Sequence, residues 1–151
     1  MFTKSQLLEN YKKIQVRPPE FLTESTYPAG IESGIVMYRG KTSDFENAMQ
    51  FLCNAISYWD VEGQPYESWK SDWWLWVEYM LPQFLYRPIE KSVIGEQLVN
   101  VFGYASEEVN PNLPDERSAV AALLLVDEWN KTTVLVEYEA DFVYASWHTT
   151  A

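Results

Sequence analysis

The C-terminal part of the chain, residues 119–148, constrains the fold more than any other segment. Residues 119–126 form an uninterrupted apolar run, and periodicity alone assigns such a run to a buried strand or to a buried helix. A turn at Asn130 follows, and residues 132–138 then alternate between apolar and polar side chains, as a strand does. A last strand is expected at 142–148. We therefore interpret 119–126 as a strand that opens an antiparallel meander.

Helices are predicted in the preceding part of the chain, where apolar residues recur at helical spacing. The predicted helices cover residues 4–14, 44–59, 67–81 and 89–102. Thr3 with Gln6, and Ser43 with Glu46, have the spacing of a capping box, in which each side chain binds a backbone donor at the start of a helix. Gly103 is placed to cap the last of these helices.

One more strand is predicted near residues 34–39, where β-branched and aromatic side chains precede a glycine. Proline, glycine and serine mark residues 17–33 and 106–115 as loops. No repeat or linker divides the sequence, so we expect a single domain over residues 1–151. The predicted class is α+β, with a mostly antiparallel sheet packed by three to four helices.

The charge is strongly negative and unevenly distributed. Twenty-two acidic residues against 11 basic ones give a formal net charge of −11. Residues 1–41 have a net charge of +2, and residues 42–151 have a net charge of −13. Such a surface repels nucleic-acid phosphates and anionic membranes and attracts basic proteins, although acidity also serves solubility alone. With no apolar run long enough to span a bilayer and no signal sequence, a cytoplasmic location is expected.

Catalytic and metal-binding motifs are not recognisable in the sequence. His148 is the only histidine and Cys53 the only cysteine, so the common zinc sites cannot be assembled. We interpret His148 as a strand-end residue and Cys53 as a core residue. Glu137 and Glu139 would share one face of a strand, as a hydrolase pair could, but this alternation is more typical of the solvent face of a half-covered sheet. No catalytic residue, metal or cofactor is predicted.

The candidate binding surface lies in the tryptophan-rich segment. Trp69, Trp73 and Trp76 at helical spacing are predicted to face the core, and Trp74 to be partly exposed. Aromatic side chains among carboxylates suit a basic protein partner. The predicted partner-binding residues are Asp60, Glu62, Tyr66, Glu67, Asp72, Trp74 and Glu78. Residues 107–141, with a net charge of −7, form an alternative acidic surface.

In its size, its acidity, its lack of catalytic motifs and its β-rich end at 141–149, the chain resembles bacterial immunity proteins of contact-dependent and polymorphic toxin systems. The resemblance implies an inhibitor that occludes the active site of a basic nuclease toxin. The main alternative is a type III secretion chaperone that holds an effector segment as a homodimer. A small enzyme that uses Glu137 and Glu139, and a mimic of nucleic acid, are further alternatives.

Overall fold

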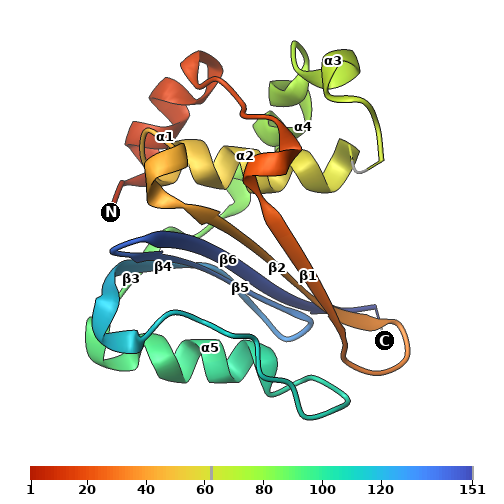
Figure 1. Cartoon of the computed structure of the whole chain (residues 1–151), viewed down its shortest axis with the longest axis vertical. Helices are drawn as coiled ribbons and strands as arrows, with labels where there is room; N and C mark the ends of the chain where they lie inside the picture. The colour runs from red at the N-terminus through yellow and green to blue at the C-terminus, as the bar shows by residue number, and fades with distance from the viewer. Residues whose placement is uncertain (62, 151) are drawn as a thin grey trace.

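The computed structural model describes residues 1–61 and 63–150, and it contains a six-stranded antiparallel sheet with helices on both faces (Figure 1). The strands lie in the order β1-β2-β6-β5-β4-β3. Their bounds are Thr23–Pro28 (β1), Ser33–Lys41 (β2), Arg87–Ile89 (β3), Ala119–Glu128 (β4), Lys131–Tyr138 (β5) and Asp141–Thr149 (β6). The α+β class and the C-terminal meander are therefore confirmed, and residues 119–126 are part of a strand.

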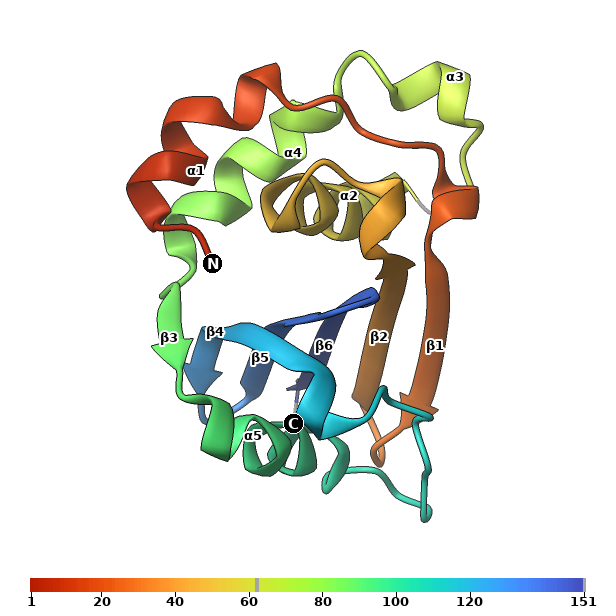
Figure 2. The same cartoon turned by 60° about the vertical axis from the view of Figure 1, so that its left-hand side comes forward.

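The helices form two layers of unequal size (Figure 2). One face of the sheet is covered by α1 (Lys4–Asn10), α2 (Ala48–Val61), α3 (Tyr66–Trp69) and α4 (Trp73–Met80), and the other by α5 (Ile94–Phe102) with the loop that follows it. Short 3-10 turns at Tyr11–Lys13, Pro19–Phe21, Thr42–Asp44, Leu81–Gln83, Lys91–Val93 and Glu116–Ser118 join these elements. Among the described residues no helix is long and apolar enough to cross a bilayer.

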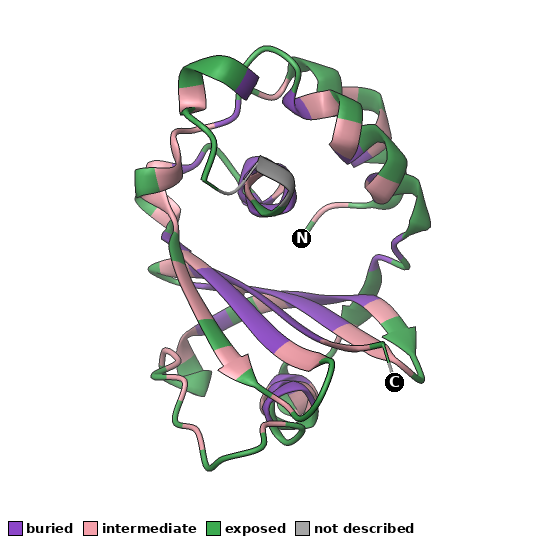
Figure 3. Ribbon diagram, turned by 90° about the vertical axis from the view of Figure 1, so that its right-hand side faces the viewer, coloured by how far each residue is buried: buried purple, intermediate pink, exposed green. Residues whose placement is uncertain are grey.

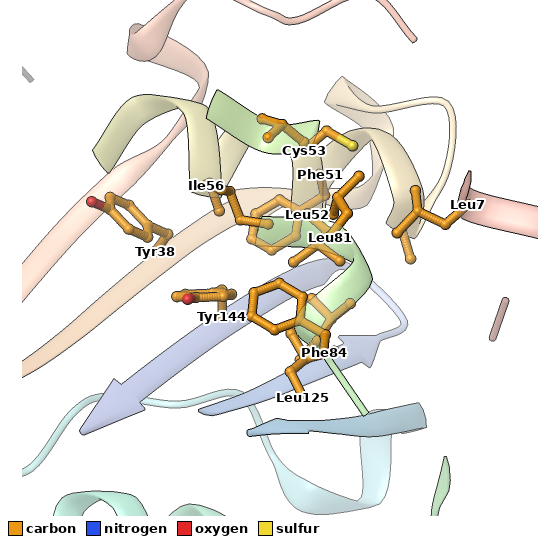
Figure 4. Packing of buried hydrophobic residues seen from close by; sticks show 14 of the residues in the cluster. Leu7, Tyr38, Phe51, Leu52, Cys53, Ile56, Leu81, Phe84, Leu125 and Tyr144 are labelled. Carbon is orange, nitrogen blue, oxygen red and sulfur yellow. The ribbon is translucent and has the colours of Figure 1, made fainter. Parts of the chain in front are cut away.

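Both faces of the sheet are buried, which explains the continuous apolar run in β4. Leu123 and Leu125 pack toward α2 and α4, while Ala122 and Leu124 pack toward α5. Figure 3 shows buried residues along the middle of the sheet and on the inner sides of the helices, and Figure 4 shows side chains of α2 directed at those of the sheet. The prediction of a half-covered sheet is therefore wrong. Glu137 is half-buried, and Glu139 follows the end of β5 in a turn.

The two predicted capping boxes have different outcomes. The box of Thr3 and Gln6 is present at the start of α1. The box of Ser43 is wrong, because residues 42–44 form a 3-10 turn and α2 begins only at Ala48. Phe45 is extended between them and buries its ring against Phe51 and Phe142. The side chain of Asn47 accepts the backbone N–H of Gln50 instead, at 3.0 Å.

Three predicted boundaries are also wrong. The expected helix 67–81 is divided into α3 and α4, since both Trp69 and Trp73 turn into the core across a short turn. The expected loop 17–33 contains β1, whose polar sequence suits an edge strand. The expected helix 89–102 starts only at Ile94, because the chain before it forms β3. Pro88 is tolerated in β3, because β3 is an edge strand, at the other edge of the sheet from β1.

Candidate functional site

Cations of the N-terminal segment occupy part of the predicted partner-binding surface. Glu78 on α4 accepts a hydrogen bond from the Tyr11 hydroxyl at 2.7 Å and lies 3.5 Å from the Lys12 ammonium. The Tyr11 hydrogen bond, with the charge of Lys12, lowers the pKa of Glu78. The same ammonium lies 5.2 Å from the ring centre of Trp74, which is partly exposed as predicted. Glu78 and Trp74 thus already have a cationic neighbour within the chain.

The other residues of the predicted surface have mixed environments. The Tyr66 hydroxyl donates to the Val16 carbonyl at 3.0 Å, and its ring packs edge-on against Trp69. Glu67 pairs with Lys70, and Asp72 is exposed just before α4.

Two predicted residues lie at the end of α2. Asp60 belongs to the last turn of that helix, and Glu62 lies outside the described residues. Among the tryptophans, Trp69 and Trp73 are buried as predicted, whereas Trp76 is only partly buried.

A second acidic surface lies on α5 and the loop 103–118, on the other face of the sheet (Figure 2). Between α5 and this loop is a groove of about 710 Å³, hereafter the α5 groove. Its apolar lining includes Leu98, Phe102, Val109, Leu113 and Tyr138. Carboxylates of Glu107, Glu108 and Glu116 also line it, and none of the three has an ion pair with a described residue. The groove combines apolar surface with uncompensated negative charge.

A second groove of about 860 Å³ follows the opposite side of α5, next to β3 and the β4–β5 turn. Val99, 68% exposed, lines both grooves and lies between them. Trp129 at the β4–β5 turn is 78% exposed, and Tyr104 stacks on Trp147 with ring centres 3.7 Å apart. Asp127 in this groove is 3.6 Å from Arg87, so the charge here is partly compensated. We refer to the two grooves with Val99 and Trp129 as the α5 face.

The sequence of α5 accounts for this geometry. Ile94, Leu98 and Phe102 recur on one side of the helix and are buried against the sheet. Gly95 faces the loop, where a Cβ atom would lie 1.8 Å from a carboxylate oxygen of Glu116. A glycine in the first turn of α5 therefore lets the Glu116 side chain approach closely. An apolar Val99 on the outer side of the helix was the sequence signal that could have indicated this surface.

The residues weighed for catalysis are separated by the fold. Cys53 is fully buried in the core, as predicted, and burial raises the pKa of its thiol. His148 lies near the end of β6 with its ring centre 5.9 Å from that of Trp59; burial and the charge of Lys131 lower its pKa. The described residues contain no group of three or more His, Cys, Asp or Glu residues that could hold a metal ion.

No protein-family model, curated protein or solved structure matches this chain.

Proposed function

We propose that the chain is a binding protein that inhibits a basic protein partner, an immunity-type inhibitor that covers the active site of a nuclease toxin. The observation that carries the proposal is the α5 groove, in which carboxylates that pair with no described cation border apolar surface. Apolar contact at the centre of an interface supplies affinity, and charges at its rim speed association and select the partner. The α5 groove offers both.

The α5 groove supports this function better than the surface of α3 and α4. Glu78 and Glu67 already have partners in Lys12 and Lys70, so part of their negative charge is compensated within the chain. Residues 94–117 contain five acidic residues and one basic residue, Arg117, which pairs with Asp115. The segment keeps a net charge of −4, which favours the approach of a cationic partner.

The proposed mechanism is occlusion. A nuclease binds phosphates through lysine and arginine side chains, so its active-site surface is basic. Carboxylates of Glu107, Glu108 and Glu116 would pair with those cations, while Val99 and the apolar lining contact the surface between them. Inhibition then requires no chemistry in this chain, because substrate and inhibitor compete for the same cations.

The test compares two variants in which carboxylates are replaced by neutral amides. E107Q/E108Q/E116Q removes the carboxylates of the α5 groove, and E67Q/D72N removes exposed carboxylates from the other surface. The partner is recovered with the tagged wild-type chain and identified. Its association rate is then measured at low and at high salt, and its nuclease activity is titrated with each variant.

We expect the α5 variant to associate at least about tenfold more slowly at low salt, to lose most of its salt dependence and to inhibit more weakly. E67Q/D72N should behave as the wild type does. An unchanged rate for the α5 variant at low salt would reject this surface. A homodimer that holds an extended segment and blocks no activity would instead favour the chaperone hypothesis.

A further inference from the structure

A small pocket lies on the other face of the sheet from α5, between the sheet and helices α2 and α4. Its volume is about 250 Å³. It is lined by Ile56 and Trp59 from α2, Trp76 and Met80 from α4, and Lys131 and Tyr144 from the sheet. Figure 4 shows Ile56 and Tyr144 on facing elements. We call it the Trp59 pocket. Its walls are mostly apolar and aromatic, with one ammonium among them.

Lys131 is a cation without a counterion in this pocket. Its side chain is half-buried, and it has no ion pair with any residue in the described part of the chain. Burial lowers the pKa of Lys131, an effect that the charge of Glu128 only partly opposes. A buried charge is costly unless it is paired. An anion that entered the pocket would supply the missing partner.

The indole nitrogen of Trp76 is a second group without a partner. Nε1 of Trp76 is buried and donates to no acceptor in residues 1–61 and 63–150. Buried donors are nearly always hydrogen-bonded in folded proteins, so each exception requires an explanation. A carboxylate is a ligand group that accepts both kinds of donor, an indole N–H and a lysine ammonium.

The size and walls of the pocket restrict the rest of the ligand. An apolar cavity of about 150 Å³ is large enough to hold benzene. A pocket of about 250 Å³ accommodates one ring with a small substituent. Flat aromatic walls from Trp59 and Trp76 favour an aromatic ring by stacking or edge contacts.

We propose that the Trp59 pocket is a binding site for a small aromatic carboxylate, with its ring between Trp59 and Trp76 and its carboxylate on Lys131. The pocket and the α5 face lie on different faces of the sheet. The inference is therefore independent of the proposed function, and either can fail without the other.

The experiment titrates the wild-type chain with benzoate and with benzamide, its neutral counterpart, by calorimetry and by NMR of the indole N–H groups. A ligand of this size should bind with a dissociation constant on the order of 1 mM. Benzamide should bind at least about tenfold more weakly, because it leaves Lys131 unpaired. The indole resonance that is missing in W76F should be among those that benzoate shifts.

The variants K131M and K91M separate the role of Lys131 from a general effect of positive charge. K131M keeps most of the apolar length of the side chain and should lose the preference for benzoate over benzamide. K91M removes an exposed lysine outside the pocket and should bind benzoate normally. Equal affinity of the wild type for the two probes, or no saturable benzoate binding at about ten times the expected dissociation constant, would overturn the proposal. That comparison needs no variant, so it decides the question even if K131M does not fold.

Discussion

The buried hydroxyl pair of Thr133 and Ser146 allows a quantitative test of how the centre of the sheet is held together. Both residues are almost fully buried, and their side-chain oxygens are 2.7 Å apart across β5 and β6. Thr133→Val keeps the shape of the side chain but removes the hydrogen bond. The Ser146 hydroxyl is then left with that of Tyr144 as its neighbour. We expect T133V and S146A each to lower the free energy of unfolding by about 1–2 kcal/mol.

The double variant should cost less than the sum of the two single variants. Once both hydroxyls are gone, neither is left buried without its partner, but the Tyr144 hydroxyl loses both of its neighbours, which reduces the gain. We therefore expect a coupling energy of about 0.5–1 kcal/mol. Urea unfolding followed by tryptophan fluorescence measures all four proteins of the cycle. Additive single costs, within about 0.3 kcal/mol, would show that the two hydroxyls do not depend on each other and would refute the reasoning.

Three further results are expected. Cys53 should not react with a thiol reagent in the native protein and should react after unfolding, since its thiol is buried and its pKa is raised. Burial and the charge of Lys131 lower the pKa of His148, so folding favours the neutral imidazole. The free energy of unfolding should therefore decrease as the pH is lowered from about 7 to about 5, and it should decrease less in H148Q. Tyr104→Ala should destabilise the fold by about 1–3 kcal/mol, because it uncovers the ring of Trp147. Replacing the exposed Trp129 should change the stability by less than about 0.5 kcal/mol. Thermal unfolding of the two variants tests both expectations.

The strands and helices that are strongly patterned could be predicted from the sequence. Residues 132–138 alternate as a strand does, and the capping box of Thr3 is local, so both were predicted correctly. β1 and β3 could not be found in this way. They are edge strands, defined by pairing with β2 and β4 rather than by their own composition. The start of α2 was misplaced because the burial of Phe45 outweighs a favourable local cap at Ser43.

The candidate site was less predictable because charge counts say nothing about pairing. The segments 44–78 and 107–141 have nearly equal net charges in the sequence. Only the folded chain places Lys12 beside Glu78 and leaves Glu107 without an ion pair among residues 1–61 and 63–150. The Trp59 pocket was still harder to anticipate. It joins residues from α2, α4, β5 and β6 that are separated by up to about 90 positions.

The positions of the N-terminal cations make the charges of the two helical layers unequal. Lys12 lies beside Glu78 and Trp74 of α4, and Lys4 donates to the Pro82 carbonyl just after that helix, so these two cations lie over the larger helical layer. Arg39 on β2 is an exception, because its guanidinium donates to the Asn112 carbonyl in the loop after α5 and pairs with Asp141. We propose that a basic partner that approaches at long range is oriented toward the α5 face before any contact forms, because Glu107, Glu108 and Glu116 have no ion pair with a described residue. Because this orientation depends on where the cations lie, removing Lys12 and Lys4 should weaken the preference for one face while increasing the overall attraction. The two effects can be separated by cross-linking of the complex, which reports the face, and by the association rate, which reports the attraction.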